Sequence, residues 1–161
     1  MLSSLSNKAT VWVFQSDRKL SSVDIEAINK HLEVFIPEWS AHGTNLKAAY
    51  EVVYDFFIIV GVDEDLAEAS GCSKDGLTRA IKLVGEQINV DFFNRLNTAY
   101  IDEMDRIQLV NMIEFKTLVQ ADKINRGTKV FNNLITTKEE LESVWQVKLK
   151  DSWHANLVPV L

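Results

Sequence analysis

Two stretches of this chain are apolar at consecutive positions, and they constrain its fold more than any other feature. Residues 10–14 and 56–60 read TVWVF and FFIIV, rich in β-branched and aromatic residues without polar alternation. Such runs are typical of strands that are buried on both faces of a sheet. We therefore expect a central sheet with a packed layer on each side of it.

Helical and extended patterns alternate around these two strands. The expected elements, in chain order, are a strand at 10–14, a helix that Ser21 or Ser22 caps and Pro37 ends, a strand at 47–54, a strand at 56–60 after a tight turn near Asp55, a helix from Leu77 to Ile88 and a hairpin at 99–110. This β-α-β-β-α-β order predicts an α+β fold with a ferredoxin-like antiparallel sheet and both helices on one face. The third strand would then lie between the first two.

The last third of the chain is predicted to extend this core. We expect one α+β domain over residues 1–161, with a core at about 8–111 and a C-terminal α/β appendage at about 112–161. A ferredoxin-like layer leaves one face of its sheet exposed to solvent. Because the two strands are apolar on both faces, another part of the protein must cover that face. The appendage is the first candidate, with four large apolar side chains, Phe131, Leu134, Trp145 and Trp153. A sheet-to-sheet homodimer is the alternative to a monomer.

Charge and cysteine content limit the class of protein. The 17 basic residues are outnumbered by 23 acidic ones, giving a net charge of -6, which argues against a nucleic-acid partner. No apolar run is long enough to span a bilayer, so no membrane partner is expected. The single cysteine cannot form an internal disulfide, and this favours a cytoplasmic protein.

The single cysteine, Cys72, is the first candidate for a catalytic residue. In the split arrangement the end of the third strand, which leads to Cys72, lies beside the start of the second, which follows His42. A helix N-terminus and a neighbouring imidazolium both favour the thiolate, which is the nucleophilic form. The predicted catalytic set is Cys72 as nucleophile with His42 or His154 as base. The alternative is a small, inert residue that fills space before a helix capped by Ser73.

The same segment is the predicted binding site. The backbone N–H groups of Ser70, Gly71 and Ser73 would donate to an anion at the N-terminus of the helix, with Lys74 beside it. Trp39 is also predicted to be part of this binding site. No cofactor is expected, because the chain lacks the G-x-x-x-x-G-K-[ST] phosphate loop.

No metal site is predicted. The three histidines share no ligand spacing, and the acidic residues after the third strand lack an EF-hand pattern. These acidic residues, which would also disfavour a thiolate at Cys72, are Asp63, Glu64, Asp65 and Glu68.

Four short motifs carry a resemblance to a known family. They are W-x-x-H at 39–42, S-G-C-S-x-D at 70–75, V-F-N-N at 130–133 and D-S-W-H at 151–154. With them the chain resembles, over nearly its whole length, a bacterial family of uncharacterised proteins sometimes labelled ABC transporter ATPases. The missing phosphate loop does not support that label. The resemblance implies a cytoplasmic, single-domain protein and draws attention to Cys72, His42 and His154.

Three functions follow from these observations. The first is a non-catalytic or regulatory domain that binds a small molecule or a protein. The second is a thiol-dependent transferase or hydrolase that uses Cys72, with N–H groups around Ser73 stabilising an oxyanion. The third is a structural subunit of a larger complex.

Overall fold

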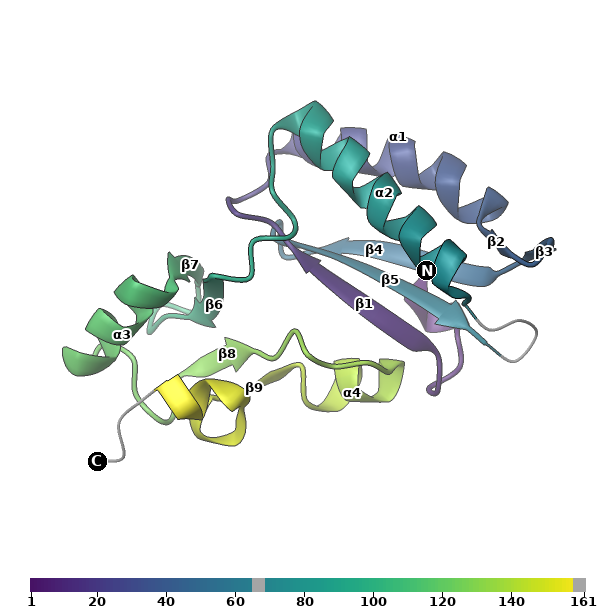
Figure 1. Cartoon of the computed structure of the whole chain (residues 1–161). Helices are drawn as coiled ribbons and strands as arrows, with labels where there is room; N and C mark the ends of the chain where they lie inside the picture. The colour runs from purple at the N-terminus through teal and green to yellow at the C-terminus, as the bar shows by residue number, and fades with distance from the viewer. Residues whose placement is uncertain (65–68, 158–161) are drawn as a thin grey trace.

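The computed structural model describes residues 1–64 and 69–157, which form two main antiparallel sheets with helices packed against them (Figure 1). The elements, in chain order, are η1 (Leu2–Ser4), β1 (Thr10–Gln15), α1 (Ser22–Glu38), β2 (Ser40–Ala41), β3 (Thr44–Asn45), β4 (Lys47–Val53), β5 (Phe57–Asp63), α2 (Gly71–Ile88), β6 (Asn97–Ile101), β7 (Ile107–Asn111), α3 (Met112–Gln120), β8 (Lys129–Phe131), α4 (Lys138–Ser143), β9 (Gln146–Lys148), η2 (Leu149–Asp151) and η3 (Trp153–Leu157). The mixed α+β class expected from the sequence is confirmed.

The first sheet has the strand order β1-β5-β4, and both of its strand pairs are antiparallel. The third strand expected from the sequence therefore lies between the first two. The turn between β4 and β5 is also where the sequence predicts it, because Tyr54 and Asp55 both have positive φ, at 57° and 59°. Two consecutive residues with positive φ match the turn type that suits the twist of a hairpin.

The expected four-stranded ferredoxin-like sheet is not formed. The hairpin of β6 and β7 does not join β1; it belongs to a second sheet with the order β7-β6-β8-β9. A short strand takes whichever edge its connections allow, and here β8 offers β6 a partner. The second sheet thus combines β6 and β7, from the predicted core, with β8 and β9, from the predicted appendage.

Each face of the first sheet has its own core, because the side chains of β5 alternate between the faces. All seven residues of β5 are buried. Ile58, Val60 and Val62 pack with α1 and α2, whereas Phe57 and Ile59 pack with the N-terminal and C-terminal segments. The two layers demanded by the doubly apolar strands are both present.

The layer opposite the helices comes from both ends of the chain. Phe131 and Trp145 belong to its core, as the sequence predicts, but Leu134 is 69% exposed and Trp153 36% exposed, so those two do not cover the sheet. Leu2 and Leu5 take part instead. They approach β5 over Gly61, where an added Cβ would lie 2.7 Å from Leu5 Cδ1 and 2.9 Å from Leu2 Cδ2.

The second helix begins earlier than its apolar spacing suggests. α2 starts at Gly71 rather than Leu77, and Ser70 caps it by accepting the Ser73 N–H at 3.2 Å. The expectation that Ser73 is the cap is therefore wrong. Polar residues fill the first turn, so the apolar stripe alone gave too short a helix.

A glycine near the other end of α2 provides a test of this packing. An added Cβ at Gly85 would lie 2.6 Å from the Val90 carbonyl oxygen, where the chain turns back after the helix. We expect Gly85→Ala to lower the free energy of unfolding by about 2 kcal/mol through overpacking, although alanine is normally the better helix former. Urea denaturation measures the change.

Gly76→Ala is the matched control. Its Cβ would meet only Trp39 Nε1, at 3.9 Å. It should raise stability by about 0.5–1 kcal/mol, the ordinary helix-propensity gain. Equal effects of the two substitutions would contradict the close approach at Gly85.

Candidate functional site

The helices α1 and α2 are tied to each other at both ends. The buried Trp39 indole follows α1 and donates from Nε1 to the Ser73 carbonyl oxygen, 2.8 Å away in the first turn of α2. At the other end, Arg18 donates to both oxygens of Asp24, near the start of α1, and to the Ile88 carbonyl oxygen at the end of α2. The two helices therefore run antiparallel over the sheet.

Asp24 holds the Arg18 end of this arrangement. Its carboxylate accepts from Arg18 Nη1 at 2.7 Å and from the backbone N–H of Ser21 at 2.8 Å, completing the capping box of α1. The Arg18 hydrogen bond and the Ser21 N–H hold the pKa of Asp24 far below its usual range. This end of the helix pair is thus charged, hydrogen-bonded and fixed.

Cys72 and His42 lie at the Trp39 end, on one hollow of about 450 Å³ that Trp39 and Ser70 also line. The split arrangement of the first three strands brings them together, as the sequence argument expects. Cys72 is exposed, so it does not fill buried space before the helix. His42 is also exposed, in a turn where its φ is 51°.

Two of the N–H groups around Ser73, its own and that of Lys74, already have hydrogen-bond partners within the cap. Ser70 Oγ accepts the Ser73 N–H, and the Ser70 carbonyl oxygen accepts the Lys74 N–H at 3.0 Å and the Ser73 hydroxyl at 2.8 Å. The cap thus takes up the Ser73 N–H, one of the donors that the thiol-enzyme hypothesis assigned to a substrate. Lys74 is exposed, and Gly71 has open space where a Cβ would stand, so no close backbone approach requires a glycine there.

His154 lies far from this hollow. Figure 1 places η3 at the opposite end of the molecule from the N-terminus of α2. The His154 ring is 2% exposed, packs near Phe115 and shares a 2.7 Å hydrogen bond, through Nδ1, with Ser152 Oγ. The structure therefore does not bring His154 to Cys72 as a base.

Two of the four acidic residues, Asp63 at the end of β5 and Glu64 after it, make structural hydrogen bonds. Asp63 is buried, accepts from Lys47 Nζ at 2.8 Å and from Ser6, and these contacts lower its pKa. Glu64 accepts from Thr10 Oγ1 and from the Ala69 N–H. Asp65 and Glu68 lie outside the described residues. Within residues 1–64 and 69–157, no cluster of three or more His, Cys, Asp and Glu side chains is placed to hold a metal ion.

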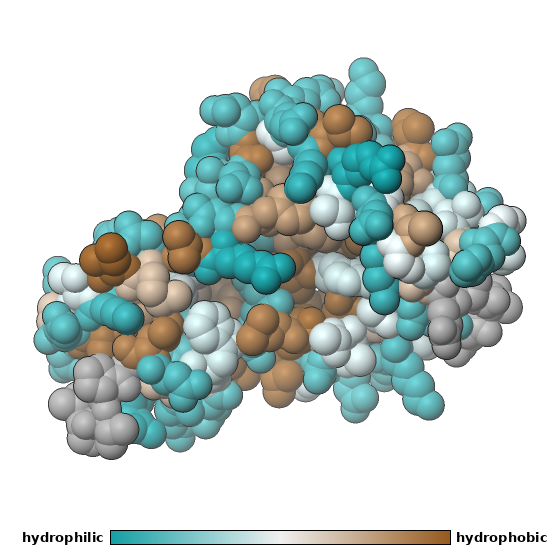
Figure 2. Space-filling view, in the orientation of Figure 1, coloured by the Kyte–Doolittle hydropathy of each residue, from teal (hydrophilic) through white to brown (hydrophobic). Residues whose placement is uncertain are grey.

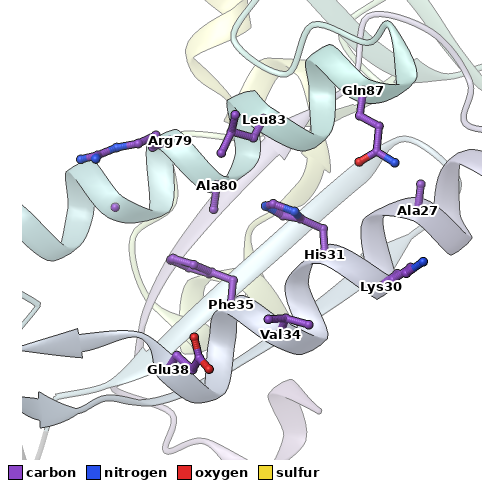
Figure 3. Close-up of a pocket in the computed structure, with 11 residues that line it drawn as sticks. Ala27, Lys30, His31, Val34, Phe35, Glu38, Arg79, Ala80, Leu83 and Gln87 are labelled. Atoms are coloured by element: carbon purple, nitrogen blue, oxygen red, sulfur yellow. The ribbon is translucent and has the colours of Figure 1, made fainter.

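A second hollow, larger than the one at Cys72, is one that the sequence argument missed. A groove of about 640 Å³ runs between α1 and α2, and it shares Phe35, Glu38 and Gly76 with the hollow at Cys72 (Figure 3). Its rims carry Val34 and Leu83, which are 64% and 53% exposed. The sequence did contain an indication of this groove. Val34 and Leu83 lie next to the buried apolar positions of their helices, so each helix has a wider apolar face than the part that packs into the core.

Comparisons with known protein families, with curated proteins and with solved structures find no match. The resemblance based on the four motifs therefore stays a prediction. In the part of the chain that the structure describes, no helix has the length and apolar character needed to cross a bilayer.

The buried His154 makes stability depend on pH. Burial lowers its pKa from 6.5 to about 4 in the folded protein. The unfolded chain binds the proton first as the pH falls below about 6.5, so stability is lost between there and about pH 4, by up to roughly 3 kcal/mol. We expect His154→Gln to remove this part of the loss, measured as urea denaturation at pH 7.5 and at pH 4.5.

His42→Gln is the matched control, because His42 is exposed. It should retain the pH dependence of the natural protein. Carboxylates such as Asp63 also make stability fall in acid, and they do so equally in the natural protein and in both variants. The difference between the variants therefore gives the contribution of the His154 imidazole. An unchanged pH dependence in His154→Gln would contradict a buried neutral ring.

Proposed function

We propose that this protein is a non-catalytic binding domain of the cytoplasm, whose ligand is a small, mainly apolar molecule with an anionic group. The groove between α1 and α2 carries the proposal. Its volume of about 640 Å³ falls in the range of small-molecule sites, roughly 300–1,000 Å³. The helices that form it are fixed at both ends by Trp39 and Arg18, so the groove exists before a ligand enters.

The lining of the groove favours an apolar ligand. Five apolar side chains from the two helices share it: Ala27, Val34, Phe35, Ala80 and Leu83. Figure 3 shows Phe35 and Ala80 between the helices, with Leu83 on α2 and Val34 on α1 beside them. Covering exposed apolar area contributes about 25 cal/mol per Å², so a ligand that spans both rims gains from Val34 and Leu83 together.

The polar groups indicate where an anion would bind. Lys30 and Gln87 stand at one end of the groove, Arg79 and Glu38 at the other, and His31 points from α1 toward α2 between them (Figure 3). Glu38 offsets the charge of Arg79 at its end. The described lining at the Lys30 end contains no carboxylate, so a ligand anion is better placed there, beside a cation and an amide donor.

Charge placed in the groove should weaken the binding of an apolar anion. The probe is anilinonaphthalene sulfonate, which combines an aromatic body with one negative charge and fluoresces when it enters an apolar site. We expect Val34→Asp and Leu83→Asp each to weaken its binding by at least about tenfold, because a carboxylate would be desolvated against the dye. Fluorescence titration gives the Kd.

Val23→Asp is the control for exposure alone. Val23 is 71% exposed on α1 but does not line the groove, so its substitution should leave dye binding unchanged. Equal losses in all three variants, or no binding by the natural protein, would contradict the groove as the site.

Thiol chemistry is the second candidate function, supported by the exposure of Cys72 and by the hollow that it shares with His42. If His42 assists the thiol, native Cys72 should react with iodoacetamide at pH 7 at least about tenfold faster than in the urea-unfolded chain, because the thiolate is the nucleophile. His42→Ala should remove the difference, while His31→Ala should not. A native rate equal to the unfolded rate would leave an ordinary accessible thiol and reject this candidate.

A further inference from the structure

We propose that the ligand of the groove between α1 and α2 is a single-chain carboxylate, whose tail runs past Gly76 into the hollow beside Cys72. This inference rests on the proposed function, because it names the class of molecule that the groove would take. The groove and the hollow share Phe35, Glu38 and Gly76, so they adjoin and form one trough along the helix pair. A trough of two adjoining hollows suits an extended chain, whereas a compact ring system would fill only one of them.

The length of the trough sets the length of the chain. Its lining on α1 extends from Lys30 to Trp39, which follows the helix. These nine steps span about 13 Å at 1.5 Å per residue. A zigzag carbon chain with bonds of about 1.5 Å and angles near 111° advances about 1.25 Å per carbon. A carboxylate held at Lys30 therefore has room for a tail of about ten carbons.

The Lys30 end of the trough carries the charge that a carboxylate needs. Lys30 and the Gln87 amide stand together there (Figure 3). Glu26 and Glu33 lie within one turn of Lys30 on α1, but neither belongs to the described lining. Among the ion pairs of the described residues, none involves Lys30, so its ammonium is available to a ligand.

The opposite end of the groove has no such excess of charge. Glu38 and Arg79 both line it, one acidic and one basic, so their charges offset each other. That end of the groove attracts neither an anion nor a cation as a whole. The ligand that matches both ends is charged at one end and neutral at the other, which describes an amphiphile with a single head group.

An aromatic wall connects the groove to the hollow. Phe35 and Trp39 are one helical turn apart, with ring centroids separated by 5.6 Å, and both line the hollow. Figure 3 shows Phe35 between the two helices. Across from this wall, Gly76 has no side chain, and an added Cβ there would meet only Trp39 Nε1, at 3.9 Å. The passage is therefore open at the residue that the groove and the hollow share.

The first experiment measures affinity against chain length. Saturated carboxylates of about six to fourteen carbons, kept below the concentration at which they form micelles, compete with anilinonaphthalene sulfonate for the full chain. Full burial of a methylene gives about a fourfold gain, and a trough open to solvent covers roughly half of the chain. We therefore expect Kd to fall about twofold per added carbon and to level off at roughly ten to twelve carbons.

Gly76→Leu tests the passage. The leucine side chain would fill the space between Trp39 and the groove, so the gain in affinity should stop several carbons earlier, while the six-carbon acid keeps its Kd. Gly71→Leu is the matched control on the same helix. Gly71 belongs to neither described lining and has open space where a Cβ would stand, so this variant should keep the natural length profile.

Lys30→Gln tests the head group. It should weaken decanoate by at least about fivefold and leave 1-decanol unchanged, because only the carboxylate uses the ammonium. Lys74→Gln is the control for charge alone, since Lys74 is exposed on α2 outside both described linings. It should bind decanoate as the natural protein does.

The outcomes separate this inference from the proposed function. Dye binding together with a Kd that does not depend on chain length, or a natural length profile in Gly76→Leu, would overturn the inference and leave the groove as a site. If the natural protein binds neither dye nor carboxylate, both are overturned. Displacement by two-chain phospholipid vesicles as strong as by decanoate would assign the chain to a membrane lipid. A doubled mass with loss of dye binding at high concentration would assign the groove to a second copy. Either result would also overturn the inference.

Discussion

The structure depends on the two-sided burial of β5. Its seven residues are all buried, so each must be covered from above or below, and neighbouring residues demand opposite layers. Ile58 and Val60 require the helices, while Phe57 and Ile59 require the layer built from the two ends of the chain. The N-terminal segment and the C-terminal third are therefore required for the fold. They supply the second half of the core that the central strand needs.

The same constraint keeps functional groups out of the interior. β5 has no polar side chain except Asp63 at its end, where Lys47 and Ser6 satisfy the carboxylate. Polar groups that could meet a ligand are left at the boundaries of layers, such as the seam between α1 and α2. Because Trp39 and Arg18 fix both ends of that seam, its middle stays open without a hinge. A preformed groove loses less conformational entropy when it binds.

Local patterns predicted the elements well, and long-range pairing poorly. The apolar runs, the turn at Asp55 and the helix cap at Ser21 are each determined within a few residues, and each appears in the structure. The choice of β6 between β1 and β8 depends on residues far along the chain, which no local pattern encodes. The same limit applies to the site. Topology brought Cys72 and His42 together, but the exposure of Cys72, the burial of His154 and the groove depend on packing.

The loss of the fourth strand also explains the shape beside β1. Strands lie about 4.8 Å apart, so three strands give a sheet about 14 Å wide and four would give about 19 Å. Two helices packed side by side at about 10 Å occupy roughly 20 Å. The helix layer thus matches a sheet of four strands better than the three that are present. Since α1 packs over β4, the excess width falls to α2 on the β1 side. On that side the chain after β8 takes up part of this width, because the Thr136 carbonyl oxygen accepts the Val11 N–H and the Lys138 N–H donates to the Ala9 carbonyl oxygen.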